Sequence, residues 1–194
     1  MTQKKISELK EIHTGEDVWV LAAGPSMNYL DPSFFENKVT VGVNRVCKFF
    51  SCDYVVAKDG RGFFEILENS DHDTKLVLSK HESGNLCQNL NNCEREHYIF
   101  EHPAKPGENP DISCIRKDSD KIVVSYSTIT SAIHFSAYFR WLAQIGNHTT
   151  LVANELKKAY GCNIHSINPF LNFNLEGHKY VTSHKGQIFQ RNLK

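Results

Sequence analysis

The sequence predicts an α/β fold, with a Rossmann-like, mostly parallel sheet and helices on both faces. Two observations predict it. Three apolar runs follow one another closely, VWVLAA at 18–23, VTVGV at 39–43 and YVVA at 54–57, and each is nearly continuous, as in a strand buried on both faces. A largely apolar segment at 127–146 then predicts a long, well-buried helix that stops at its final glycine.

Further β-branched runs predict strands that alternate with helical or turn-rich segments, at 75–79, 97–101, 121–125 and 149–153. The charged N-terminal segment 1–12 predicts a short amphipathic lead-in helix. Between 81 and 120 the composition turns polar and holds three of the six prolines, which is typical of loops. We therefore expect a polar loop insertion or lid there, over one end of the sheet.

Composition narrows the class of protein. A length of 194 residues suits one domain, 1–194, with a C-terminal tail at about 170–194. Lys plus Arg and Asp plus Glu number 22 each, which argues against a partner such as bulk nucleic acid. No apolar stretch approaches the ~18–20 residues of a membrane span, and no signal-peptide core is visible. Six cysteines without a Cys-x-x-Cys pair indicate reduced thiols and a cytoplasmic protein.

The first apolar run ends abruptly on Gly24, Pro25 and Ser26. Ligands of parallel α/β sheets bind beyond the carboxyl ends of the strands. Gly24 lets a ligand approach the backbone, Pro25 fixes the turn, and Ser26 offers a hydroxyl and an N–H to a phosphate at the start of a helix. The alternative is a tight strand-to-helix turn without a ligand.

Small polar groups also follow the next two predicted strands. Asn44 ends the second strand, Asp59 follows the third, and Thr130 and Ser131 lie in the first turn of the long helix. Polar groups that converge on one edge are typical of a nucleotide site. Each also has a structural explanation, as a strand-end cap, a turn former or a helix cap.

In this order, the motifs resemble a superfamily of nucleotide-dependent transferases. The matching features are an apolar strand, Gly-Pro-Ser, a strand ending in Asn, YVVAKD, and ITSAIHFSAYFRWLAQIGNHTTLVANEL, over about 17–60 and 127–156. The superfamily contains the family-42 bacterial sialyltransferases, the motility accessory factors that glycosylate flagellin, and the 6-hydroxymethylpterin pyrophosphokinases of the DUF115 group.

The resemblance implies a set of nucleotide-binding residues: Ala23, Gly24, Pro25, Ser26, Asn44, Thr130, Ser131, Asn154 and Glu155. Asp59 matches the acidic strand end of the pyrophosphokinase and motility-factor branch and is expected in the catalytic centre. Asn154 and Glu155 stand where the family has Gly-Ile-Asp, so this chain departs from the pattern at the base-binding edge.

The resemblance also implies a catalytic histidine about thirty residues further on. His184, in GHKYVTSHKG, lies at about that distance, and a neutral imidazole suits a general base that takes a proton from an acceptor hydroxyl. A solvated tail histidine is the alternative explanation, and His165 is the second choice for the base.

Metal use separates the two enzymatic hypotheses. The family-42 transferases are metal-independent, whereas a pyrophosphokinase needs magnesium to bridge phosphates. Asp-x-Asp triplets occur at 71–73 and 118–120. Both precede predicted strands instead of following them, and we interpret both as surface turns without a metal.

The leading hypothesis is a metal-independent, nucleotide-sugar-dependent glycosyltransferase of the sialyltransferase type. It takes a nucleotide-sugar donor and a hydroxyl acceptor as substrates and needs no further cofactor. One alternative is an ATP- and magnesium-dependent pyrophosphokinase of the hydroxymethylpterin type, and another is a nucleotide-binding module without catalysis. The modest length leaves open whether a second copy of the chain completes the site, as a homo-oligomer.

Overall fold

The computed structural model describes residues 3–23, 27, 31–58, 62–80, 93–101, 111–116, 118–124, 128–139 and 147–162. These ranges form a six-stranded, all-parallel sheet in the order β1-β6-β5-β4-β3-β2. Its strands are β1 (Gln3–Lys5), β2 (Val18–Leu21), β3 (Val39–Val43), β4 (Tyr54–Ala57), β5 (Lys75–Ser79) and β6 (His97–Phe100). The predicted α/β, Rossmann-like fold is confirmed.

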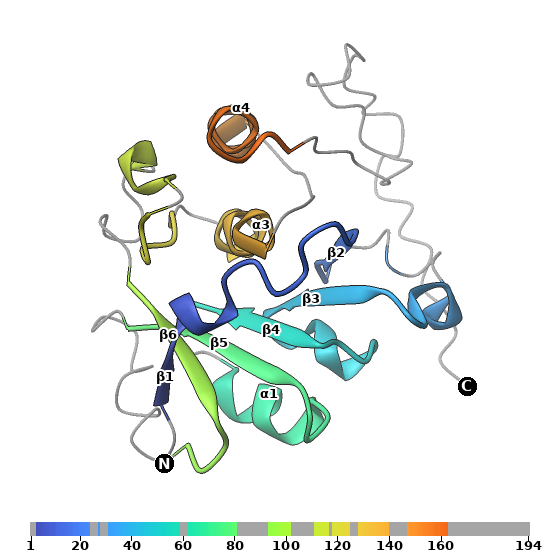
Figure 1. Cartoon of the computed structure of the whole chain (residues 1–194). Helices are drawn as coiled ribbons and strands as arrows, with labels where there is room; N and C mark the ends of the chain where they lie inside the picture. The colour runs from blue at the N-terminus through green and yellow to red at the C-terminus, as the bar shows by residue number, and fades with distance from the viewer. Residues whose placement is uncertain are drawn as a thin grey trace.

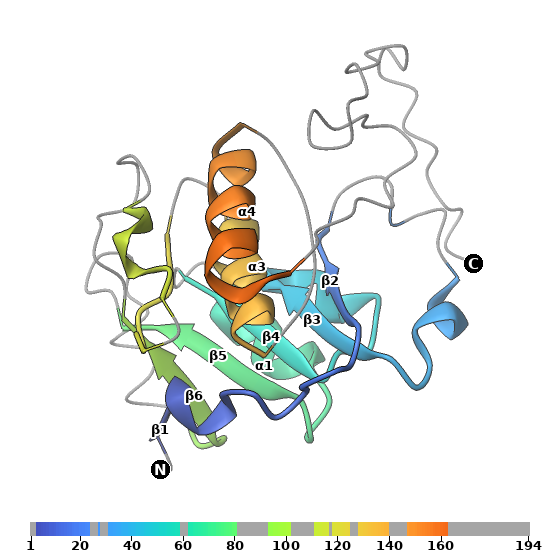
Figure 2. The same cartoon turned by 45° about the horizontal axis from the view of Figure 1, so that its top comes forward.

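Helices cover both faces of the sheet (Figure 1). The α-helices are α1 (Phe63–Asn69), α3 (Thr128–Phe139) and α4 (Asn147–Tyr160), and short 3-10 helices are η1 (Ile6–Leu9), η3 (Pro32–Phe35), η4 (Asn44–Lys48) and η5 (Ile112–Cys114). Figure 2 shows α3 lying on the sheet and α4 lying over α3. Helix α1 packs on the opposite face, against η4. Within the described ranges, no helix has the length and apolar character that crossing a membrane requires.

Strand β4 shows why both faces must be covered. Tyr54 and Val56 belong to the core beneath α3 and α4, whereas Val55 and Ala57 belong to the core beneath α1. None of the four is more than 1% exposed. The nearly continuous apolar run in the sequence is therefore the pattern of an interior parallel strand.

Most predicted strands are confirmed: 39–43, 54–57 and 75–79 as stated, and 97–101 as β6, which ends at Phe100. The first strand ends at Leu21, before the last two residues of its apolar run. In the run at 121–125, Lys121 makes a single parallel bridge to Glu101, and the next three residues are buried without forming a strand.

The predicted strand at 149–153 is wrong, because these residues lie in helix α4. Val152, Leu156 and Tyr160 recur at every fourth residue and form one buried stripe on that helix. The stripe packs in the same core as α3. Packing along the whole helix thus outweighs the local β preference of its first turns.

The predicted N-terminal helix is wrong in most of its length. Residues 3–5 form β1, which extends the sheet beside β6, and a single turn, η1, follows. Ile6 and Leu9 of that turn are at most 3% exposed. Pairing with β6 gives the backbone hydrogen bonds that a helix would otherwise make within itself.

The polar region predicted at 81–120 contains an interior strand, β6, between β5 and β1. The polar stretches 81–92 and 102–110 on either side of it lie outside the described residues. Helix α3 accounts for the predicted helix at 127–146 over Thr128–Phe139, and residues 140–146 lie outside the described part of the chain.

A buried chain of hydrogen bonds fixes the helical layer of α3 and α4. The Val123 amide donates to Nδ1 of His134 at 3.0 Å, and Nε2 of His134 lies 3.3 Å from the Tyr160 hydroxyl, which donates to the Arg116 carbonyl at 3.1 Å. Since an amide can only donate, Nδ1 is unprotonated and Nε2 carries the proton. His134 is fully buried, and burial lowers its pKa to about 3.

This network predicts that acid weakens the fold through His134. Below the unfolded pKa of about 6.5 the unfolded chain binds a proton there that the folded chain excludes, so stability falls with falling pH, by about 2 kcal/mol between pH 7.5 and pH 5. Urea unfolding at several pH values measures the slope. The variant His134→Gln is expected to be less stable at pH 7.5 and to lose this part of the pH dependence.

The matched control is His72→Gln, since the His72 side chain is 97% exposed. It should leave the pH slope of the unfolding free energy unchanged. An equal pH slope in wild-type protein and His134→Gln would contradict the assignment of a neutral buried His134.

Candidate functional site

The candidate site is the edge of the sheet where the parallel strands end, which we call the carboxyl edge. Helix α3 begins there: Phe135, in its second half, contacts the ring of Tyr54, the first residue of β4, at a centroid distance of 5.7 Å. The helix therefore runs from the carboxyl edge towards the opposite, amino edge. Its N-terminus, with the positive end of the helix dipole, faces the site.

Three cationic side chains follow three adjacent strands at this edge. Arg45 comes shortly after β3, Lys58 directly after β4 and Lys80 directly after β5. Lys58 is only 8% exposed, although its charge makes burial costly. Lys80 pairs at 3.2 Å with Glu101, the residue that follows β6. Cationic side chains at the edge where a helix begins can bind a phosphate or diphosphate group.

These three cations are not among the site residues predicted from the sequence. The signal was present, because each cation stands within two residues of the end of an apolar run. The prediction considered small polar side chains and so included Asn44 and Asp59. It left out the basic neighbours of these two residues, Arg45 and Lys58.

Arg45 is held in place by its surroundings. Gly62 has a φ of +80°, and a Cβ there would lie 2.9 Å from the Arg45 side chain, which would have to shift. Glu65 on α1 accepts from Arg45 at 3.3 Å and from Lys48 at 3.0 Å. The hydrogen bond from Lys48, helped by the charge of Arg45, lowers the pKa of Glu65.

Asn44 has an unusual backbone conformation. Its φ of 52° lies in the left-handed region, which asparagine tolerates better than most side chains do. The chain turns there from β3 into η4, and the half-buried Asn44 side chain lies at the carboxyl edge. Backbone conformations of this kind are concentrated at functional sites.

Thr130 and Ser131 also lie where the sequence analysis expects them, in the first turn of α3. Both are buried, at 1% and 0% exposed. The Ser131 hydroxyl donates to the Val123 carbonyl at 3.0 Å, which ties the helix start to the preceding segment.

The remaining predicted residues have different outcomes. Ala23 is exposed and follows β2 at the carboxyl edge. Asn154 and Glu155 lie in helix α4 and not at the end of a strand, and Glu155 pairs with Lys158 at 2.6 Å. The other predicted residues lie outside the described part of the chain: Gly24, Pro25, Ser26, Asp59 and His184.

The four aspartates of the two Asp-x-Asp triplets lie at the surface. Asp71 and Asp73 are exposed ahead of β5, at the amino edge, and Asp118 and Asp120 are exposed ahead of Lys121. Among the described residues, no group of three or more His, Cys, Asp or Glu side chains is arranged to hold a metal ion.

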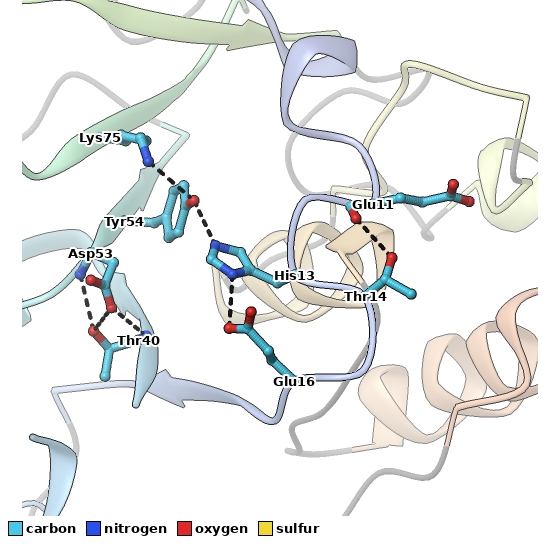
Figure 3. Close-up of polar contacts among 8 residues, drawn as sticks. All are labelled: Glu11, His13, Thr14, Glu16, Thr40, Asp53, Tyr54 and Lys75. Carbon is cyan, nitrogen blue, oxygen red and sulfur yellow. Dashed lines mark hydrogen bonds and ion pairs between the residues drawn. The ribbon is translucent and has the colours of Figure 1, made fainter. Parts of the chain in front are cut away.

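A second polar cluster lies at the amino edge (Figure 3). Glu16 pairs with Nδ1 of His13 at 3.1 Å, and Nε2 of His13 lies 2.8 Å from the Tyr54 hydroxyl, which also accepts from Lys75 at 3.4 Å. Burial raises the pKa of Tyr54, so its hydroxyl stays protonated. The cluster ties the connection between β1 and β2 to the first residues of β4 and β5.

Substitutions at Asn44 test the left-handed turn separately from ligand binding. We expect Asn44→Gly to keep or raise the unfolding free energy, because glycine adopts this φ freely. Asn44→Val should lower it by about 1–2 kcal/mol, because a branched side chain is strained there. Urea denaturation measures both, and equal stabilities of the two variants would contradict the strained turn.

In comparisons with known proteins, no family model, no curated protein and no solved structure matches the chain. The functional assignment therefore depends on the geometry of the carboxyl edge.

Proposed function

We propose that this protein is a nucleotide-sugar-dependent glycosyltransferase that binds its donor at the carboxyl edge. The observation that supports it most is that Arg45, Lys58 and Lys80 follow three adjacent strands at the edge where α3 also begins. Two of these cations have carboxylate partners, Glu65 for Arg45 and Glu101 for Lys80, with which a phosphate would compete. The three cations match the charge of a nucleotide's phosphates, and the fold class commonly binds nucleotides at this edge.

The cations also suit the chemistry of the transfer. When the acceptor oxygen attacks the anomeric carbon, the bond from that carbon to the donor phosphate breaks, and negative charge develops on the departing nucleotide. Cationic side chains close to the departing phosphate stabilise such charge, as a divalent ion does in other enzymes. The three cations therefore favour the metal-independent form of the proposal.

The other residues take roles that the resemblance suggests. Residues 23–26 and the first turn of α3 hold the nucleotide, and Asn44 and Asp59 orient its phosphate or sugar. His184 accepts the proton of the acceptor hydroxyl, and direct displacement inverts the anomeric carbon. Asn154 and Glu155 have no part in the proposed site, because helix α4 carries them.

A thermal-shift panel is the first test of this proposal. We expect CMP, CDP or UDP to raise the melting temperature equally in magnesium and in EDTA. A ligand at 100 times its dissociation constant adds about 2.7 kcal/mol, which is several degrees for a domain of this size. AMP, ATP and GDP complete the panel.

The other outcomes of the panel point elsewhere. A shift with ATP that requires magnesium favours the pyrophosphokinase, and AMP formation that depends on the acceptor would establish it. A shift by a cytidine or uridine nucleotide without any sugar transfer favours the binding module. A flat panel at millimolar nucleotide contradicts the proposal.

Strand β5 offers a matched pair of lysines, since Lys75 begins it at the amino edge and Lys80 follows it at the carboxyl edge. Lys80→Gln removes a charge that the phosphates would contact, and should weaken nucleotide binding roughly tenfold, the size of one charge-assisted hydrogen bond. Lys75→Gln should leave the affinity unchanged. Isothermal titration calorimetry measures both, and equal losses would place the nucleotide elsewhere.

A further inference from the structure

A groove of about 770 Å³ opens at the amino edge, opposite the candidate site. The segment around η3 forms one of its walls, and the residues that precede β4 and β5 form the other. No step of the proposed transfer uses it.

The lining of the groove combines buried aromatic side chains, which we call its floor, with exposed charged side chains, which we call its rim. Phe35 and Phe50 line it, each 6% exposed and packed edge to face at 5.7 Å. The charged side chains that line it are four exposed carboxylates and one lysine: Glu36, Asp53, Asp71, Asp73 and Lys38. The lysine is occupied, because its ammonium donates to the Phe34 carbonyl and lies 4.0 Å from the Phe34 ring centroid.

Two of the carboxylates are fixed by the fold. Oδ2 of Asp53 accepts from the amide and the hydroxyl of Thr40, both at 2.8 Å (Figure 3). Asp71 accepts from the Ser51 hydroxyl. Groups held in this way lose little conformational freedom when a ligand binds, which favours recognition of a cationic partner.

The chain itself contains a segment of matching chemistry. Residues 177–194, which lie outside the described part of the chain, include four basic side chains and no Asp or Glu. The basic residues are Lys179, Lys185, Arg191 and Lys194, and the apolar Ile188 and Phe189 stand among them. The segment therefore pairs positive charge for the rim with apolar side chains for the floor.

The segment can reach the groove. Residues 163–176 connect it to Cys162, two residues after the end of α4, and fourteen residues span up to about 46–50 Å when extended. The radius of gyration of a folded chain of this length is about 16 Å. The link is thus long enough to pass from the α4 face around the sheet to the amino edge.

We propose that residues 177–194 dock in the acidic groove of the same chain. Docking there places His184 at the amino edge, across the sheet from the nucleotide site. Residues 177–194 would therefore have two alternative positions. In one the segment is docked in the groove, and in the other His184 acts as the general base at the carboxyl edge. The inference depends on the groove and the basic segment, and it stands or falls independently of the proposed function.

Carbodiimide cross-linking of the full chain, read by mass spectrometry, tests this docking because it joins only carboxylates and amines in contact. We expect cross-links from Lys179, Lys185 or Lys194 to Glu36, Asp53, Asp71 or Asp73. In a mixture of ¹⁵N-labelled and unlabelled chains they should join residues of one chain. Mixed-isotope cross-links would show that a second copy supplies the segment, and would overturn the proposal, as would cross-links scattered over exposed carboxylates such as Glu68.

Charge reversal on the rim is a second test of the docking. Asp71→Lys with Asp73→Lys should lower cross-linking at the unchanged Glu36 and Asp53 roughly fivefold or more, because two ion pairs become repulsive. The control Glu68→Lys, on the exposed side of α1, should leave the yield unchanged. Lys185→Gln with Arg191→Gln changes no groove residue and should lower the yield at Lys179 and Lys194. Unchanged yields in this last variant would overturn the proposal even if the rim variant failed to fold.

Discussion

The structure depends on one constraint, which is that its central strands are parallel and buried on both faces. Strands β4 and β5 lie inside the sheet, and each sends apolar side chains to both sides. Burial of a large aliphatic or aromatic side chain is worth about 1.5–3 kcal/mol. Neither face can be left to water, so the chain must supply a helical layer on each side.

The two layers are fixed by different polar devices. On one face, the buried His134 and Tyr160 join α3 and α4 to the segment that precedes them. On the other face, the guanidinium of Arg95 donates to the carbonyls of Ser70, Asp71 and Thr74, and so holds the turn between α1 and β5. The first device pairs polar groups that would otherwise be costly to bury, whereas the second lies partly at the surface.

Covering both faces leaves the edges of the sheet for polar chemistry, and the described parts of the two edges differ in charge. Arg45, Lys58 and Lys80 follow strands at the carboxyl edge, whereas Asp53, Asp71 and Asp73 precede strands at the amino edge. A chain with no net charge thus has an acidic groove at one edge and, at the other, three basic residues of which Arg45 and Lys80 pair with Glu65 and Glu101. This separation fits an anionic ligand at one edge and a basic segment at the other.

Much of the site's framework follows from the sequence by itself. Continuous apolar runs predicted the interior strands; the end of the second run placed Asn44 at the carboxyl edge, and the start of the predicted long helix placed Thr130 and Ser131 beside it. These predictions hold because burial on both faces leaves a pattern that is local in sequence. The proposed roles of those residues remain predictions.

Only the tertiary structure decided the rest. The run at 149–153 became helix because its stripe of Val152, Leu156 and Tyr160 packs in the core with α3. Residues 3–5 form a strand because their backbone pairs with β6, the neighbouring strand of the sheet. Strand order decides which cations lie at the same edge, which hydroxyls form hydrogen bonds within the fold, and where the acidic groove opens. That order is set by contacts between residues far apart in the chain.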